Sequence, residues 1–438
     1  MLVIYIGYKI WYNYCVEYKE KKMKKVELLA PAGSLEKAKI AFMYGADAVY
    51  AGTSKLSLRT RAEMNSDTLE DTIKYAHSIN KKVYVALNIY AQDQDYEEIE
   101  REIKRLDKIG ADAIIASDVG VISKIKEIAP DMEIHISTQA NTVSLEAAKF
   151  WQSYGAKRVI LARELSKDRI KYIMENKPKD LEVEMFIHGA ICFAYSGRCY
   201  LSKYLNGRCA NLGDCAQSCR WQYNIYASEV NNPDSVVNLD FDEKGTYIFS
   251  SKDMCLIKEI PTILDMGVDS LKIEGRLKTD YYLATVVRTY RQAIDDYYAL
   301  KEKGKENEYD YNKYLPELLK VKTRGLSEFY FSDSKNQDIH DFDGKSDNLD
   351  YEYGAKVISH EKDNIYVVEI KNKLSIDDKM EVLAPNSIDE KPFEITRLYD
   401  IKKGEAIDTI NPGIKGQQVK IFIPYDNLKP NTVIRRKK

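Results

Sequence analysis

Cysteines gather in one short stretch of this chain, and their thiols could hold a metal there. The 438-residue sequence has seven cysteines, and five of them lie between Cys192 and Cys219. Four of the five, Cys192, Cys199, Cys215 and Cys219, are separated in turn by six, fifteen and three residues. In a reducing compartment, thiolates brought together bind a soft metal more readily than they form disulfides. The pattern therefore favours a metal site, with disulfides and ordinary buried thiols as alternatives.

The spacing also bears on the kind of metal. A zinc ribbon normally contains close C-x2-C pairs, and none occurs here. Iron–sulfur sites tolerate wider and less regular spacing, so the pattern leans towards iron–sulfur without deciding the question. Cys209 lies between the two cysteine pairs, where Arg208 and Asn211 predict a polar loop. We therefore leave Cys209 out of the predicted ligand set.

A repeated pattern predicts the scaffold that positions these cysteines. Four stretches each carry a glycine, a short polar turn and an apolar run, which is typical of a helix end followed by a buried parallel strand. Four further apolar runs bring the number of strands to eight, and amphipathic helical stretches separate most of them. Eight such units predict an α/β fold, a (β/α)8 TIM-like barrel. The four repeated stretches are 45–52, 110–117, 155–162 and 267–274, and the four further strands are expected at 26–30, 83–88, 133–138 and 183–188.

A doubly wound sheet is the alternative to the barrel. That fold usually carries a glycine-rich phosphate loop after its first strand. Here Ala30-Pro-Ala-Gly33 stands at that place. We therefore prefer the barrel.

In a barrel, the residues at the carboxyl ends of the strands converge on one face, where chemistry is usually found. Those positions are rich in arginines, asparagines and carboxylates, which suits an anionic ligand. The cysteine segment follows the seventh strand and should cap the same face. The residues expected there are Glu27, Arg59, Arg61, Asn65, Asn88, Asp118, Ser137, Gln139, Asn141, Arg163, Glu164, His188, Lys272, Glu274 and Arg276.

Several of these candidates have a structural alternative. His188 could act as an acid or base or serve the fold alone, and Glu184 could bond a neighbouring strand inside the barrel. Lys272, Glu274 and Arg276 alternate along one strand and share a face, where an internal layer of salt bridges is the alternative to a ligand site.

The loop after the second strand offers a further ligand site. Arg59 and Arg61 share a face if this loop is extended, and Asn65 follows within reach. Planar guanidinium groups bind carboxylates with two hydrogen bonds, so these residues could hold a dicarboxylate. Solvated loop arginines are the alternative.

Composition and local patterns divide the chain into parts. Lys and Arg number 66 against 68 Asp and Glu, so nucleic-acid binding would need a local basic patch. We expect a catalytic barrel over 23–331 with a cysteine-rich insertion at 190–250, a polar linker over 332–350 and a small β-barrel domain over 351–438. The basic tail 435–438 could contact phosphates, although a solvated terminus is the expected state.

The first 22 residues are apolar but are interrupted by Lys9 and Asn13, which leaves no run long enough to span a membrane. A signal peptide is the alternative for this N-terminal extension. Met23 stands before the first strand and is the expected start of translation.

The cysteine segment and several other runs resemble the collagenase-like peptidase family U32. The resemblance covers about residues 24–430. Within that family, 189–221 and 238–282 most resemble the subgroup that hydroxylates tRNA with prephenate. The runs that carry it are Glu184–Cys192, Tyr195–Ser202, Gly213–Trp221, Glu27–Gly33, Ser251–Asp253 and Leu271–Arg276.

The resemblance implies a cytoplasmic enzyme that adds a hydroxyl group at C5 of the wobble uridine of tRNA. It implies an iron–sulfur cluster of the [4Fe–4S] type on Cys192, Cys199, Cys215 and Cys219. Prephenate would be the anionic co-substrate and the tRNA anticodon loop the macromolecular partner, with no membrane contact. A partner protein of the same family is a further expectation. The residues expected to bind substrate are Arg59, Arg61, Asn65, Arg163, Lys272 and Arg276, and those expected to handle protons are His188, Glu274 and Glu184. The small domain and the basic tail would grip the RNA backbone.

A peptidase is the second hypothesis and a non-catalytic iron–sulfur scaffold the third. The sequence contains no G-x-S-x-G and no H-E-x-x-H motif. Of five histidines, only His135 and His188 are conceivable bases. Cys192 could pair with His188 as a nucleophile only if it were not a metal ligand, so the metal site weakens the peptidase hypothesis.

Overall fold

The computed structural model describes most of the chain. Arg59 and Arg61 lie outside the described residues, as do the N-terminal extension and most of the expected linker. The described residues are 25–53, 56–57, 64–192, 194–195, 198–224, 226–229, 232–238, 250–332, 339–341, 350–385, 387–413 and 416–438.

Eight parallel strands close into a barrel, which confirms the predicted fold. Neighbouring strands pair in sequence order, and β11 pairs in parallel with both β7 and β1, which closes the ring. Alanine, valine, leucine and isoleucine dominate these strands because helices or other strands cover both of their faces. The barrel strands are β1 (Glu27–Pro31), β2 (Ala48–Gly52), β3 (Lys82–Ala86), β4 (Ala113–Ala116), β5 (Glu133–Ile136), β6 (Arg158–Ile160), β7 (Glu182–Ala190) and β11 (Ser270–Ile273).

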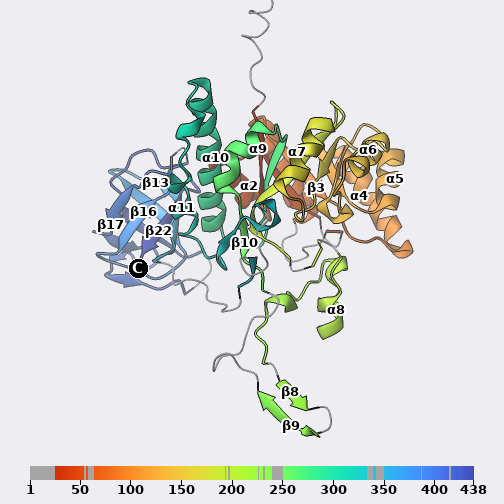
Figure 1. Ribbon diagram of the computed structural model, residues 1–438. Coiled ribbons are helices and arrows are strands. Elements are labelled where there is room, and N and C mark those ends of the chain that lie inside the picture. Colours follow the sequence, from red (N-terminus) through yellow and green to blue (C-terminus); the bar gives the residue numbers. More distant parts are fainter. Residues whose placement is uncertain are drawn as a thin grey trace, which may run out of the picture.

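Helices surround the barrel (Figure 1). The longer ones bury an apolar stripe, as in α4, where Ile99, Ile103 and Leu106 face the core at helical spacing. Side-chain caps begin several of them, for example Ser34 of α2 and Thr279 of α10, each of which accepts a backbone N–H three residues ahead. The helices are α2 (Leu35–Met43), α3 (Ser66–Ser78), α4 (Tyr96–Lys108), α5 (Val119–Ile128), α6 (Leu145–Ser153), α7 (Lys167–Asn176), α9 (Ile260–Asp265), α10 (Asp280–Glu302) and α11 (Leu315–Leu318).

The cysteine-rich insertion leaves the barrel after β7 and projects from one end of it (Figure 1). The chain then returns through β10 (Asp253–Cys255), which runs antiparallel to the end of β7 and pairs with β12 (Leu326–Ser327). The insertion contains α8 (Leu201–Asn206), the short 3-10 helices η4 (Ala210–Leu212) and η5 (Ser218–Arg220), and a hairpin of β8 (Tyr226–Glu229) and β9 (Asn232–Asn238).

The C-terminal domain is an antiparallel sheet of eight strands. Its edge strands β17 and β19 are not hydrogen-bonded to each other in the part of the chain described, so the sheet is open where a barrel was predicted. The sheet nevertheless curls around one apolar core, which includes Phe393 of β17 and Leu398 of β18. Its strands, in spatial order, are β17 (Pro392–Glu394), β16 (Lys379–Val382), β22 (Val433–Lys437), β13 (Tyr351–His360), β14 (Ile365–Ile370), β21 (Gln418–Phe422), β18 (Leu398–Asp400) and β19 (Glu405–Ala406).

The basic end of the chain forms a strand, and the expectation of a solvated tail is wrong. β22 lies between β16 and β13 inside the sheet. Arg435 is fully buried, with its guanidinium 2.7 Å from Glu317 and 2.5 Å from Glu381. Because these carboxylates pair with Arg435, that side chain does not reach RNA phosphates.

The expected linker also packs in part against the barrel. Ile339 is buried with Ile191 and Phe329, and its carbonyl accepts a hydrogen bond from Lys252 N at 2.9 Å. The apolar Ile339 therefore anchors this polar segment beside the start of the insertion. In the described part of the chain, every helix is too short or too polar to cross a bilayer.

Candidate functional site

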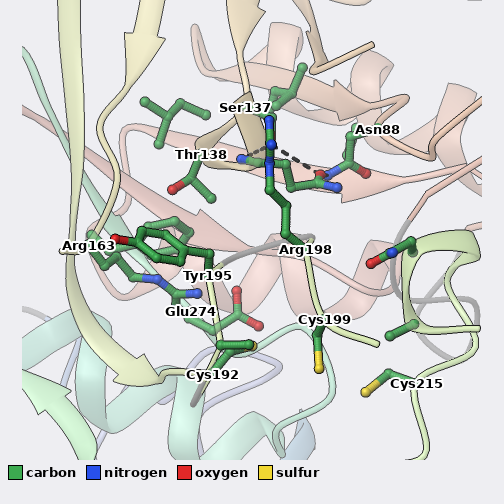
Figure 2. A pocket seen from close by; sticks show the side chains of 18 of the residues that line it. Asn88, Ser137, Thr138, Arg163, Cys192, Tyr195, Arg198, Cys199, Cys215 and Glu274 are labelled. Atoms are coloured by element: carbon green, nitrogen blue, oxygen red, sulfur yellow. Dashed lines mark hydrogen bonds between the residues drawn. The ribbon is translucent and has the colours of Figure 1, made fainter. Parts of the chain in front are cut away.

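A cavity of about 350 Å³ opens at the carboxyl end of the barrel, under the cysteine insertion (Figure 2). The ends of the barrel strands form the floor of the cavity, and the cysteine insertion forms the wall opposite that floor. It therefore lies where the barrel fold usually places chemistry. The polar and charged residues that line it are Asn88, Ser137, Thr138, Gln139, Arg163, Arg198, Asn211, Lys272, Glu274 and Arg276.

All four predicted cysteine ligands line this cavity. Cys192 follows the end of β7, Cys199 precedes α8, Cys215 follows η4, and Cys219 lies in η5. Figure 2 shows the sulfurs of Cys192, Cys199 and Cys215 on one side of the cavity, beside the insertion. None of the six described cysteines forms a disulfide. The fold thus brings to one cavity four cysteines that span 28 positions of the sequence.

Local structure explains how the insertion presents its cysteines. Ser202 Oγ of α8 accepts a hydrogen bond from Ala216 N at 2.9 Å, and Asn206 Nδ2 donates to Ser218 Oγ at 3.3 Å. These two bonds tie α8 to the segment that carries Cys215 and Cys219. Cys209 lines a neighbouring cavity instead, which agrees with its omission from the ligand set.

The four thiols line one cavity, as a shared metal centre would require. Within the described ranges, no three His, Cys, Asp or Glu side chains already surround one point as a mononuclear site requires. Zinc–sulfur bonds of about 2.3 Å would hold four sulfurs roughly 4 Å apart. In an iron–sulfur cluster each iron takes its own cysteine, so the ligands stand further apart around a larger centre. Burial raises the pKa of the Cys219 thiol, Arg220 lowers it in part, and the other three thiols raise it further.

Cations occupy the floor of the cavity. Arg163 donates from Nη1 to the Ala190 carbonyl at 3.1 Å, and its guanidinium lies 5.1 Å from the ring centre of Phe186. Lys272 Nζ lies 4.4 Å from the ring centre of Tyr50, and Arg276 is only 5% exposed. The contacts with the Phe186 and Tyr50 rings and with the Ala190 carbonyl orient Arg163 and Lys272. All three cations line the cavity. Lys272 is paired with Glu184, so Arg163 and Arg276 are the cations of this wall that could meet the predicted anionic ligand.

A layer of ion pairs lies beneath the cavity and includes Glu184. This carboxylate is fully buried and bonds Lys272 at 2.8 Å and Arg158 at 3.0 Å. Arg158 also bonds Glu27 at 2.6 Å and Glu182 at 2.7 Å. Burial raises the pKa of Glu184, but Lys272 and Arg158 outweigh it and hold the pKa below its usual range. Glu184 does not line the cavity, and Glu27, which begins β1, lies in the same layer and not at the mouth as expected.

Glu274 and a group of amides face the cavity from different walls. Tyr50 donates its hydroxyl proton to Glu274 Oε2 at 3.1 Å. On the other wall, Gln139 Oε1 accepts hydrogen bonds from Asn88 Nδ2 and from Ser137 Oγ. Gln139 Nε2 is buried at the cavity and has no hydrogen-bond partner in the structure. A buried amide N–H without a partner can donate a hydrogen bond to a carbonyl oxygen of a ligand.

His188 lies on the other side of its strand, against α10. Phe186 of β7 pairs with Lys272 of β11, but His188 pairs with the very next residue, Ile273, so β7 contains a bulge. The bulge turns His188 to the outer face of the barrel. There its Nδ1 lies 3.3 Å from the hydroxyl of Tyr290, and burial lowers its pKa to about 4. The expectation that His188 belongs to the converging ring is therefore wrong.

Asn65 has a structural place as well. Its Oδ1 accepts a hydrogen bond from Thr68 N at 2.8 Å and caps the start of α3. Its side chain is exposed, and it does not line the cavity. Asn65 therefore begins a helix, and the structure gives it no contact with the site.

The sequence missed several lining residues. Tyr50, Phe186, Tyr195 and Arg198 all contribute to the cavity wall. Tyr50 and Phe186 sit on strands, and side-chain alternation along those strands would have found them. Tyr195 and Arg198 lie between the first two cysteines, where only the folded insertion shows which way they point (Figure 2).

Two family models and several named proteins match this chain. The model of peptidase family U32 matches residues 33–341, and that of the peptidase family U32 C-terminal domain matches 350–435. The tRNA hydroxylation protein P of Escherichia coli is 37% identical, over 92% of this chain and 95% of that protein.

Two further relatives carry different names. A 23S rRNA 5-hydroxycytidine synthase of Escherichia coli is 34% identical over 73% of this chain and 47% of its own length. A collagenase of Porphyromonas gingivalis is 32% identical over 94% of this chain and 97% of that protein. With both family models matched and relatives alike over nearly the whole length, this chain belongs to peptidase family U32.

Proposed function

We propose that this protein hydroxylates tRNA, adding a hydroxyl group at C5 of the wobble uridine with prephenate as co-substrate. The observation that carries the proposal is one cavity lined by four cysteines and by Arg163, Lys272 and Arg276. Relatives named for hydroxylation of tRNA and for synthesis of 5-hydroxycytidine in rRNA support the reaction type. Both names describe RNA hydroxylation, and the second places the hydroxyl at C5 of a pyrimidine.

Cys192, Cys199, Cys215 and Cys219 would hold an iron–sulfur cluster of the [4Fe–4S] type at the cavity wall. Such a cluster supplies one-electron redox chemistry next to the bound substrates. The four cysteines fit it because they line one cavity and form no disulfides. The insertion carries all four cysteines and forms this wall of the cavity.

The cations of the cavity floor would bind the co-substrate. Prephenate is a dicarboxylate, and arginine guanidinium groups hold carboxylates in defined orientations. Arg163 and Arg276 line the same cavity, and Phe186 supports Arg163 from below. Arg59 and Arg61 lie outside the described residues, so Arg163 and Arg276 take the leading part in this proposal.

The amide wall would receive the nucleobase. A uracil presents two carbonyl oxygens and one N–H, and the buried Gln139 Nε2 can donate to such a carbonyl. A base in an anticodon loop must leave its stack to enter a cavity of this kind. Glu274 stands at the same cavity and could accept or donate a proton at the bound base.

The geometry gives the peptidase hypothesis no support. Neither His135 nor His188 is hydrogen-bonded to a serine or a cysteine. Both rings are buried, and burial lowers the pKa of each. Since His188 faces α10 while Cys192 faces the cavity, the two cannot act together as nucleophile and base.

The proposal is tested by the modification state of tRNA in a strain that lacks this gene and any second copy. Mass spectrometry should show loss of hydroxyl-derived wobble uridines, which the intact gene restores and a Cys192→Ala gene does not. Unchanged modification in the deletion strain would show that the proposal is wrong.

Iron content gives a separate test of the cysteine assignment. Protein purified without oxygen should contain iron and absorb visible light. Cys192→Ala and Cys219→Ala should each lose most of the iron, because a cluster held by three thiolates is much less stable. Cys209→Ala is the matched control, since Cys209 lies in the same insertion but does not line the site cavity.

A further inference from the structure

Exposed aromatic side chains are concentrated on the cysteine insertion. Five of the nine exposed aromatic residues in the described chain lie in the segment from Tyr195 to Tyr226. Tyr200 is 68% exposed and Tyr204 is 77% exposed, which is unusual for aromatic side chains. The five are Tyr195, Tyr200, Tyr204, Trp221 and Tyr226, and the other four are Phe150, Tyr172, Tyr330 and Tyr399.

These aromatics form the edge of the site cavity. Tyr195 and Tyr200 line the cavity yet are more than half exposed, so they stand at its mouth. Tyr204 follows Tyr200 by one helical turn at α8, and backbone Tyr204 N donates to Tyr200 O at 2.9 Å. The two rings therefore lie on one side of α8.

Trp221 directly follows η5, which the hydrogen bonds described above tie to α8, and it is 42% exposed. Tyr195, Tyr200, Tyr204 and Trp221 are hereafter called the aromatic rim.

The charge of this segment is opposite to that of the whole protein. The full chain has a net charge of −2, whereas residues 195–226 carry four cationic side chains and one carboxylate, Asp214. Asp214 is paired with Arg208 at 2.6 Å. Arg198 and Lys203 are exposed next to the rim tyrosines. Aromatic rings interleaved with cations on an exposed surface suit unstacked bases and the phosphates between them.

We infer that the aromatic rim is the surface on which a single-stranded RNA loop docks, with bases stacked on Tyr200 and Tyr204. This inference rests on the proposed function and names the surface that delivers the target base to the cavity. It also replaces the basic C-terminal tail as the expected RNA contact, because Arg435 is buried in ion pairs. An RNA loop fits better than a duplex, since paired bases offer no exposed ring face.

Binding of a fluorescent anticodon stem-loop to the full-length protein tests the inference. Tyr200→Ala and Tyr204→Ala should each weaken binding about ten-fold, in the range found for loss of one base–aromatic stack. Tyr204→Phe should bind as the unaltered protein does, because the ring face is retained. Tyr172→Ala, which removes an exposed ring from α7, is the matched control and should leave affinity unchanged. Unchanged melting temperature and iron content would show that the variants are folded.

Trp221 offers a second measurement. The chain has three tryptophans, and base stacking on Trp221 should quench fluorescence when the stem-loop is added. A Trp221→Phe variant should lose most of that quenching, and a blunt duplex of the same length should cause little of it.

The outcomes separate this inference from the proposed function. If the unaltered protein binds the stem-loop and the rim variants bind it equally well, the inference is wrong while the function can stand. If binding depends on the rim but tRNA modification survives deletion of the gene, the proposed function is wrong instead. A dimer that dissociates on Tyr204→Ala, with RNA affinity unchanged, would show that the rim joins two copies of this chain and would overturn the inference.

Discussion

At the scale of single residues, the site combines two sets of charges that have different tasks. Glu184 pairs with Arg158 beneath the cavity and with Lys272 at its floor, and all three side chains are almost fully buried. Arg163 and Arg276 stand on the cavity wall, oriented for Arg163 by a carbonyl and a ring. The buried layer supports the fold, whereas the wall arginines are placed to meet an anion. We therefore expect mutations in the two sets to have different consequences.

Replacing a wall arginine tests its role in binding. Arg276→Lys keeps the charge but loses the planar fork, so it should raise the KM for the anionic co-substrate roughly ten-fold or more. The turnover at saturation should change much less if Arg276 holds the co-substrate equally well before and during the reaction. Steady-state kinetics with prephenate and tRNA would measure both.

Arg169→Lys is the control for this prediction, since Arg169 is exposed on α7 and lies outside the cavity. Equal KM values for the Arg276→Lys and Arg169→Lys variants would exclude Arg276 from co-substrate binding.

At the scale of elements, β7 is the strand that shapes the site. Its bulge turns His188 outward, and Gly189 follows with φ of +107°. A Cβ atom at Gly189 would come within 2.5 Å of the Glu274 carbonyl and 3.1 Å of the Tyr282 hydroxyl. Glycine at this point allows β7 and the end of β11 to approach closely and so holds Glu274 at the cavity.

Gly189→Ala should therefore destabilise the protein more than a glycine replacement that meets no neighbour. Both Gly189→Ala and Gly267→Ala place a Cβ at positive φ, which costs about 1–2 kcal/mol. Only Gly189→Ala adds a backbone clash, worth about 1–3 kcal/mol more, because no atom lies within 4 Å of a Cβ at Gly267. Thermal unfolding should show the larger fall in melting temperature for Gly189→Ala. Equal losses would mean that the close approach of β7 to Glu274 carries no energetic weight.

At the scale of the whole molecule, buried polar contacts join the barrel to the C-terminal sheet. Glu317 of α11 bonds both Arg288 of α10 and Arg435 of β22. The Tyr44 hydroxyl, at the end of α2, donates a hydrogen bond to the Leu383 carbonyl. The same hydroxyl oxygen accepts a hydrogen bond from Val433 N at 3.0 Å. The groups of both domains that form these contacts are buried away from solvent. We therefore expect the two domains to unfold as one unit near neutral pH.

Acid should weaken this junction. Burial raises the pKa of Glu317, but Arg288 and Arg435 outweigh it and lower the pKa from 4.5 to about 2. A carboxyl group whose pKa is lower when folded stabilises the folded state fully above its unfolded pKa, and that stabilisation is lost as pH falls through the folded value. The contribution of Glu317 should therefore disappear between about pH 4.5 and 2, and it amounts to about 3 kcal/mol at most.

Calorimetry of Glu317→Gln measures this contribution. The variant should be less stable at pH 7 by about 3–5 kcal/mol, because two buried arginines lose a charged partner. It should also lose less stability than the unaltered protein when the pH falls from 4.5 to 2.

Glu390→Gln is the control, since Glu390 bonds Lys320 near the same junction but is 61% exposed. An equal loss of stability in the two variants would contradict the role given to Glu317.

The sequence alone predicted the barrel and the cysteine set. Glycine, polar turn and apolar strand recur along the chain, and all eight expected strands are present near their predicted positions. That success has a local cause, because helix ends and buried strands depend on neighbouring residues. The cysteines were identified by type and spacing, and their meeting at one cavity follows from the loop position after β7.

Tertiary contacts decided the rest. Strand alternation would have placed His188 at the mouth, but a one-residue bulge, set by pairing with β11 and β10, turned it outward. The basic end of the chain looked like a solvated tail until Glu317 and Glu381, far away in sequence, were found around Arg435. The sequence of one strand does not show which of its faces the neighbouring strands leave uncovered. The sequence around a charged side chain does not show whether its counter-ion is in solvent or in another domain. Those two facts depend on long-range packing, which the order of residues specifies only through the complete fold.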